Sequence, residues 1–115
     1  MRLRQMLSAK IHRATVTEAD VNYVGSITID QSLLERVDVL PGELVHVWNV
    51  NNGERFETYA LAGEPDSGMI RINGAAAHKA RPGDIVIIAA FALTDGPITP
   101  KAILVDGQNR FLRDL

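Results

Sequence analysis

The 115-residue sequence contains no cysteine. Disulfide bonds, thiolate nucleophiles and cysteine-based zinc sites are therefore excluded. Histidine is also scarce: the three copies, His12, His46 and His78, lie far apart along the chain and lack the spacing of metal ligands. We therefore expect no metal site.

A basic surplus and a large aromatic surface are missing as well. The net charge is −2 and aromatic residues make up 5% of the chain, so little could bind phosphates or stack on bases. The longest apolar run, 85–93, is too short to span a bilayer as a helix, and the first residues lack the apolar stretch of a signal peptide. We therefore expect a cytoplasmic protein with no nucleic-acid or membrane partner.

Hydrophobic residues, in contrast, make up 46% of the chain, which excludes a disordered protein. A chain of this length is long enough to bury a core of its own. We therefore expect residues 1–115 to fold as a single domain.

The local patterns are mainly those of β-strands. Alternating and β-branched apolar residues predict strands over 10–17, 27–29, 44–50, 55–61, 69–72, 85–93, 101–105 and 110–112. Asp30 is placed to cap a short helix over 31–37, and single helical turns are expected at 17–20 and 75–77. The unbroken apolar run of 85–93 predicts a strand that is covered on both faces.

One short motif occurs twice in the chain. Pro41-Gly42-Glu43-Leu44-Val45 is repeated as Pro82-Gly83-Asp84-Ile85-Val86, and each copy opens a predicted strand. Two such half-motifs in a small, mainly β chain suggest a barrel with pseudo-two-fold symmetry, because closing a sheet into a barrel removes its free edges.

The dipeptide Gly25-Ser26 lies at the start of a predicted strand. Glycine lets the backbone adopt conformations closed to other residues, and it leaves its own carbonyl open to approach. A serine hydroxyl one residue later is a potential nucleophile if a neighbouring group activates it. Taken alone, the dipeptide is more typical of an ordinary turn that leads into a strand.

Polar residues that could support such a site occur in three other segments. Lys10 and His12 share one face of the first predicted strand. Arg55 and Tyr59 share one face of a later hairpin strand. The small residues from Asn73 to His78 would let a backbone or a ligand come close. Each feature alone is also common in solvated strand ends, exposed hairpins or tightly packed turns.

Taken together and in this order, these segments resemble the bacterial pyruvoyl-dependent aspartate 1-decarboxylases. The matching motifs are Lys10-Ile11-His12-Arg13-Ala14, Tyr23-Val24-Gly25-Ser26, Trp48-Asn49-Val50 with Asn52-Gly53, Thr58-Tyr59-Ala60, and Ile72 to His78 followed by Pro82-Gly83-Asp84. The resemblance runs from about Met6 to Phe91. It implies a mainly β fold, a small six-stranded double-psi β-barrel with short helical turns. It also implies a cytoplasmic homotetramer whose sites lie at the subunit interfaces.

The resemblance further implies that the proenzyme cuts its own chain between Gly25 and Ser26. The Ser26 hydroxyl would attack the Gly25 carbonyl, elimination of the resulting ester would leave dehydroalanine, and hydrolysis would then give a pyruvoyl group. The products would be a chain of residues 1–25 and a chain of residues 26–115. The covalent pyruvoyl group would be the cofactor, with no pyridoxal phosphate and no metal. Whether a maturation factor is required stays open.

The same resemblance implies how the mature enzyme works. The amine of L-aspartate would form a Schiff base with the pyruvoyl carbonyl, which accepts the electrons released as CO₂ leaves and so gives β-alanine, a pantothenate precursor. Arg55 would bind a substrate carboxylate bidentately, Lys10 would add positive charge, and Tyr59 would donate a proton to the carbanion. The other residues implied are Thr58 and the backbone near Asn73-Gly74 as oxyanion donors, and Tyr23, Asn73, Gly74, Ala75 and Ala76 as the pocket lining.

Two alternatives stay open from the sequence. A pyruvoyl decarboxylase could act on another acidic amino acid, because the sequence does not give the length of the pocket. The chain could also be an unprocessed, non-catalytic β-barrel for binding or assembly, with Gly25-Ser26 as an ordinary turn. His12 and His78 are equally compatible with a structural role.

Overall fold

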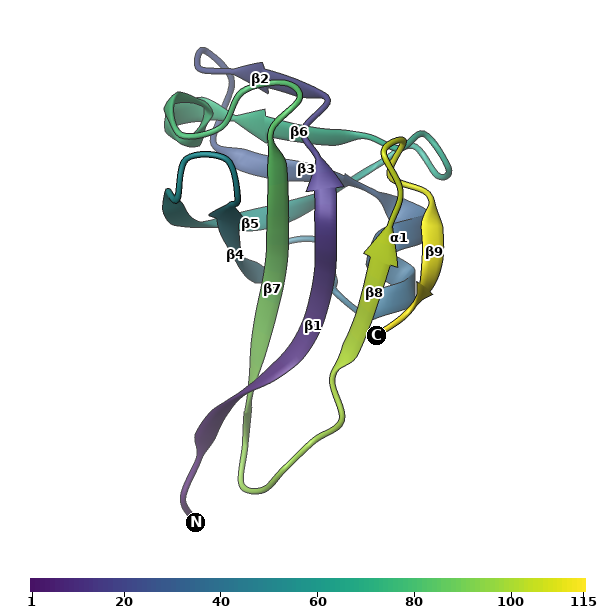
Figure 1. Ribbon diagram of the computed structural model, residues 1–115. Helices are drawn as coiled ribbons and strands as arrows, with labels where there is room; N and C mark the ends of the chain where they lie inside the picture. Colours follow the sequence, from purple (N-terminus) through teal and green to yellow (C-terminus); the bar gives the residue numbers. More distant parts are fainter.

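The computed structural model describes all residues, 1–115, and it is built mainly of β-strands (Figure 1). The elements in chain order are β1 (Arg4–Thr15), β2 (Glu18–Asp20), β3 (Ser26–Asp30), α1 (Gln31–Val37), β4 (Leu44–Asn49), β5 (Arg55–Gly63), β6 (Ile70–Asn73), the 3₁₀ helix η1 (Gly74–His78), β7 (Ile85–Thr94), β8 (Lys101–Val105) and β9 (Phe111–Asp114). No helix has both the length and the hydrophobicity to span a membrane.

All nine strands belong to one mixed sheet, in the order β2-β6-β3-β5-β4-β7-β1-β8-β9. The predicted mainly β class is confirmed. The expected closed barrel of six strands is not confirmed, because the sheet has nine strands and its end strands, β2 and β9, each pair on one side only. The sheet instead curls around its core without closing, and α1 packs against it (Figure 1).

The core is a single cluster of buried apolar side chains that both halves of the sheet share. Strict alternation produces it: Ile27 and Ile29 of β3 point inward and lie opposite Ile72 and Ile70 of β6. The prediction that 85–93 is covered on both faces is wrong at its end, because Phe91 and Leu93 are exposed. This part of β7 pairs with the start of β1, and the two strands extend beyond the body of the molecule (Figure 1).

A β-bulge interrupts β1 between Ile11 and Ala14. Arg13 takes the left-handed conformation there, with φ of 63°, so the strand gains a residue relative to β7. Ile11 and Ala14 are both buried, whereas His12 and Arg13 are not. The bulge therefore keeps two adjacent basic side chains out of the core.

The predicted helix over 31–37 is confirmed, with Asp30 as its cap through a hydrogen bond from the Ser32 amide of 2.9 Å. The predicted turn at 75–77 is confirmed as part of η1. The helical turn at 17–20 is wrong, since Glu18–Asp20 forms β2 and pairs in parallel with β6. The Thr17 hydroxyl exchanges two 3.0 Å hydrogen bonds with the backbone of Ile70, which places it in the sheet and not at a helix start.

The repeated Pro-Gly motif makes the same turn in both copies. Gly42 and Gly83 have φ of 90° and 92°, values that glycine adopts without strain. The turns lead into β4 and β7, which are neighbours and antiparallel, with Val47 opposite Ile88. The motif thus begins the two strands at the centre of the sheet.

Asn109 joins three distant segments inside the fold. Its side chain is buried, accepts a hydrogen bond from the Thr15 amide at 2.7 Å, and donates to the carbonyls of Thr15 and Gly68 at 2.8 Å each. These bonds tie the β8–β9 turn to the end of β1 and to the loop before β6. Such a side chain supplies the hydrogen bonds that neighbouring strands cannot give to these backbone groups.

We expect Asn109→Ala to lower the free energy of unfolding by about 3 kcal/mol, because it leaves buried backbone groups without partners. Equilibrium urea denaturation of the two proteins measures the change. The neighbouring Gln108 is exposed and its side chain makes no hydrogen bond, so Gln108→Ala is the matched control and should change stability by less than about 0.5 kcal/mol. Equal effects of the two substitutions would contradict the role given to Asn109.

Candidate active site

The Ser26 hydroxyl is fully buried at the start of β3, and a side-chain amide holds it there. Asn73 lies opposite Ser26 in the antiparallel β3–β6 pair, and its Nδ2 donates to Ser26 Oγ at 2.8 Å and to Thr28 Oγ1 at 3.1 Å. Both amide hydrogens are therefore engaged, which fixes the plane of the carboxamide. The Asn73 Oδ1 atom is buried and has no hydrogen-bond partner. An unsatisfied buried acceptor beside a serine hydroxyl is unusual in a purely structural turn.

The residue after Asn73 brings a second backbone against Gly25, the residue before Ser26. Gly74 has φ of 73°, and a Cβ atom built on it would lie 2.7 Å from Gly25 Cα, 2.9 Å from Gly25 N and 3.1 Å from the Tyr23 carbonyl oxygen. No larger residue could occupy position 74 without moving this segment. The predicted close backbone approach at Asn73-Gly74 is therefore present, and it is directed at Gly25.

Two residues of β5 come beside the same point. β3 and β5 are parallel, with Ile27 opposite Ala60, so the register brings Tyr59 and Thr58 next to the start of β3. Tyr59 lies on the outer face of the sheet, the face that also carries Ser26, and its side chain is 39% exposed. Thr58 lies on the other face, and its hydroxyl makes no hydrogen bond.

The remaining predicted pocket residues surround the same segment. Tyr23 lies in the exposed connection before Ser26, and Ala75 and Ala76 follow Gly74 in η1. Ala75 is exposed and Ala76 is half-buried. One chain therefore collects the following predicted residues around Ser26: Tyr23, Gly25, Thr58, Tyr59, Asn73, Gly74, Ala75 and Ala76.

Lys10 and Arg55 lie away from this group. Lys10 pairs with Ala89 of β7, which pairs with His46 of β4, so three strands, β7, β4 and β5, separate β1 from β3. At the usual strand spacing, four steps across a sheet amount to about 19 Å. Arg55 is four residues before Tyr59 on β5, about 13 Å along the strand. Measured along the sheet, the backbone positions of these two residues are therefore well separated from Ser26.

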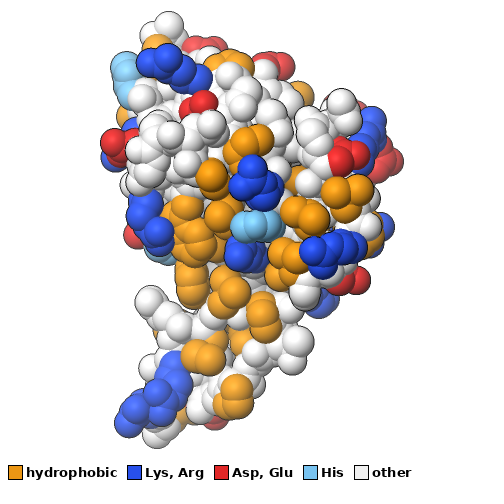
Figure 2. Space-filling view, in the orientation of Figure 1, with side chains coloured by type: hydrophobic (Ala, Val, Ile, Leu, Met, Phe, Trp, Pro, Cys, Tyr) orange, Lys and Arg blue, Asp and Glu red, His pale blue; other side chains and the backbone are white.

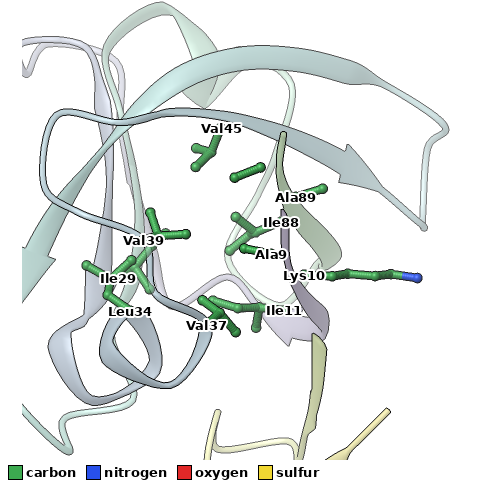
Figure 3. Close-up of a pocket in the computed structure, with 11 residues that line it drawn as sticks. Ala9, Lys10, Ile11, Ile29, Leu34, Val37, Val39, Val45, Ile88 and Ala89 are labelled. Atoms are coloured by element: carbon green, nitrogen blue, oxygen red, sulfur yellow. The ribbon is translucent and has the colours of Figure 1, made fainter. Parts of the chain in front are cut away.

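Both cations nevertheless have defined surroundings on the outer face. The Arg55 guanidinium carbon lies 4.5 Å from the centre of the Trp48 ring, a cation–π contact. Lys10 lies at the edge of a small apolar cavity of about 10 Å³ between α1 and the sheet, and its amine points away from the cavity (Figure 3). The cavity has room for about one water molecule and not for a substrate.

His12 lies near Lys10 on β1, and burial is the first cause that lowers its pKa from the usual 6.5. The positive charges of Lys10 and Arg13 lower the pKa further. The imidazole is therefore neutral at neutral pH and does not add to the positive charge of Lys10. His78, in contrast, is an exposed residue at the end of η1 and lies outside the group around Ser26.

A sequence model described as aspartate decarboxylase matches residues 1–112. The chain belongs to the aspartate decarboxylase family. The match covers nearly the whole chain, so the activity of this aspartate decarboxylase is the removal of CO₂ from aspartate. The resemblance drawn from the sequence motifs is thereby confirmed at the level of the family.

Two residues of this aspartate decarboxylase, Thr28 and Arg71, take positions that sequence patterns did not indicate. Thr28 shares the Asn73 amide with Ser26, and Arg71 stacks on the Tyr23 ring with its guanidinium carbon 4.6 Å from the ring centre. The alternation of β3 puts Ser26 and Thr28 on one face, a signal that could have revealed Thr28. Nothing in the sequence indicated Arg71, because its contacts depend on how the segment before Ser26 folds.

The lowered pKa of His12 predicts a loss of stability in acid. Below about pH 6.5 the unfolded chain takes up a proton on His12 that the folded chain resists, so the free energy of unfolding falls as the pH drops. His12→Gln removes this term, and we expect the variant to lose less stability than the parent between about pH 8 and about pH 5. Denaturation curves at the two pH values measure the difference, and parallel losses in both proteins would show that His12 is not responsible.

Proposed function

We propose that this aspartate decarboxylase cuts its own chain between Gly25 and Ser26 and uses the resulting pyruvoyl group as its cofactor. The observation that carries the proposal is the buried Ser26 hydroxyl held by Asn73, with the Gly74 backbone packed against Gly25. A hydroxyl next to a constrained glycine carbonyl is arranged for an N-to-O acyl shift. An ordinary turn needs neither the buried amide nor the close backbone contact.

The cleavage chemistry balances with water as the only added reactant. Ser26 Oγ attacks the Gly25 carbonyl carbon, the C–N bond breaks, and the freed amino group of residue 26 takes a proton, which leaves an ester. Loss of the Ser26 α-proton and departure of the Gly25 carboxylate then give dehydroalanine. Addition of water and loss of ammonia leave the pyruvoyl group at the new N-terminus. Fragment 1–25 ends in a carboxylate and fragment 26–115 begins with the pyruvoyl group.

The developing oxyanion at Gly25 needs a hydrogen-bond donor. The β3–β5 register, continued from Ile27–Ala60, sets Thr58 beside Gly25, and the Thr58 hydroxyl makes no hydrogen bond. A donor aimed at such an oxyanion contributes roughly 3 kcal/mol to lowering the barrier. We assign this role to Thr58, with the Gly74 backbone as a second contributor.

The residues around position 26 fit a pyruvoyl group. The Asn73 amide that donates to the Ser26 oxygen is the kind of donor a ketone oxygen requires, and the cradle at Gly74 has no side chain to obstruct a ligand. When formed, the group supplies a carbonyl that binds the substrate amine covalently and accepts the electron pair left as CO₂ departs. Tyr59 would deliver the proton that completes β-alanine, a precursor for pantothenate.

Arg55 and Lys10 would bind the substrate carboxylates, but from a second copy of the chain. Within one chain they lie about 13 Å or more from the Ser26 region, and the outer face of a curled sheet makes its side chains diverge. A substrate as small as aspartate spans only part of such a separation. A neighbouring subunit that presents its own Arg55 and Lys10 to Ser26 would complete the site, which supports the homotetramer implied by the resemblance.

The outer face has the composition of an assembly surface. Figure 2 shows hydrophobic side chains spread over the side formed by β7, β1 and β8, with basic side chains among them. Leu44, Phe91 and Leu93 are 56%, 40% and 66% exposed, and the β1–β7 extension makes the molecule 42 Å long against 28 and 25 Å across. A contiguous apolar area of this kind is uncommon on a monomer. The double-psi topology implied by the resemblance stays a prediction.

We expect Ser26→Ala to abolish both self-cleavage and decarboxylation, because the variant lacks the nucleophile and cannot form the ester whose elimination leads to the pyruvoyl group. Intact mass spectrometry should give two fragments for the parent protein and one 12.6 kDa chain for the variant. CO₂ release from the same samples is the second measurement. Cleavage of the parent with an ordinary amino group at residue 26, or normal CO₂ release by the variant, would refute the mechanism.

We expect Arg55→Ala to cleave itself normally but to lower kcat/KM for aspartate by about one hundredfold, because a charged hydrogen-bonding partner of the substrate is lost. Co-expression with the Ser26→Ala chain tests the shared site, since mixed oligomers would contain some interfaces with an intact Ser26 and an intact Arg55. Activity should partly return in the mixture. No recovery in oligomers shown to be mixed would mean that both residues act within one subunit.

A further inference from the structure

The segment before the cleavage point has few contacts of its own. Residues Val21 to Gly25 are all exposed, and β2, which precedes them, is a three-residue edge strand. A segment of this kind opens readily unless other groups hold it. Yet the Gly25 carbonyl must stay oriented toward the Ser26 hydroxyl for the acyl shift, and Tyr23 must stay in place to line the pocket. Some other group therefore has to restrain it.

Arg71 contacts both ends of this segment. Its Nη2 lies 3.5 Å from Asp20 Oδ2, and its guanidinium carbon lies 4.6 Å from the centre of the Tyr23 ring. Asp20 also begins the turn, because its Oδ1 accepts a hydrogen bond from the Asn22 amide at 3.0 Å. A further ion pair of 3.7 Å joins Arg71 Nε to Glu18. One cation thus connects β2, the turn and the tyrosine.

The position of Arg71 links this clamp to the site. Arg71 lies opposite Thr28 in the β3–β6 pair, two residues before Asn73, and its side chain is 27% exposed. Gly74, which follows β6 directly, packs against Gly25 and the Tyr23 carbonyl. The cleavable segment therefore lies between the Arg71 side chain at one point and the Gly74 backbone at another.

We infer that Arg71 is a positioning residue that holds the Asp20–Gly25 segment against β6 by stacking on Tyr23 and pairing with Asp20. Before cleavage it keeps the Gly25 carbonyl oriented toward the Ser26 hydroxyl. After cleavage, when Gly25 becomes a chain end, it keeps Tyr23 at the pocket. The inference rests on the proposed cleavage between Gly25 and Ser26.

The first test uses a chain that cannot cleave. In the Ser26→Ala background, Arg71→Gln should raise the hydrogen-exchange rate of the Val21–Gly25 amides about fivefold, while exchange in the core strands stays the same. Arg36→Gln is the matched control, because Arg36 makes a similar contact with Phe111, at 3.5 Å, on α1. Unchanged exchange in the segment, or an equal rise throughout the protein, would overturn the inference.

The second test uses the chain with Ser26 intact. Arg71→Gln should slow self-cleavage about fivefold and, once processed, raise KM for aspartate with little change in kcat, while Arg71→Lys should recover part of both effects. Arg36→Gln should match the parent. If the parent itself neither cleaves nor decarboxylates, the proposed function fails, whereas the exchange test still decides the role of Arg71. If the parent does both and Arg71→Gln equals it, the clamp is wrong.

Discussion

The contact between the backbones of Gly74 and Gly25 is the constraint on which the site depends. It requires a residue without a side chain at position 74, in a left-handed conformation, directly after the Asn73 that binds Ser26. The end of β6 and the start of η1 therefore place two groups together, the Asn73 amide at the Ser26 hydroxyl and the Gly74 backbone against Gly25. The register of β6 on β3 fixes both, so a shift of one residue would remove them together.

The sheet divides the functional groups by distance. Strands β3, β5 and β6 gather the residues around Ser26, while the Arg55 end of β5 and the Lys10 position on β1 lie several strand spacings away. The same outer face carries exposed apolar side chains such as Phe91 and Leu93. In the proposed shared site, catalysis and assembly would not be independent, since the surface that would join subunits also carries Arg55 and Lys10, the proposed substrate-binding cations.

The sequence was most informative where local chemistry decides the structure. Alternation in β3 and β6, the Asp30 cap of α1 and the Pro-Gly turns could all be predicted, because each depends on a few neighbouring residues. The turn at 17–20 was mispredicted because the Thr17 hydroxyl bonds to Ile70, far away in the chain. The closed barrel was expected from a repeated motif, which marks strand starts but does not determine how the edges of the sheet pair. The site residues were grouped by resemblance, and Arg71 and Thr28 were missed because their roles arise only from pairing across strands.

The place of β1 in the sheet has a consequence for a chain that is cut after Gly25. β1 lies between β7 and β8, and its Ile11 and Ala14 are buried in the core. The short fragment would therefore remain as an interior strand, held without a covalent link on either side. The folded protein would be a heterodimer of its own pieces. Its denaturation equilibrium would depend on protein concentration, and refolding would be a bimolecular association of the two fragments that slows on dilution.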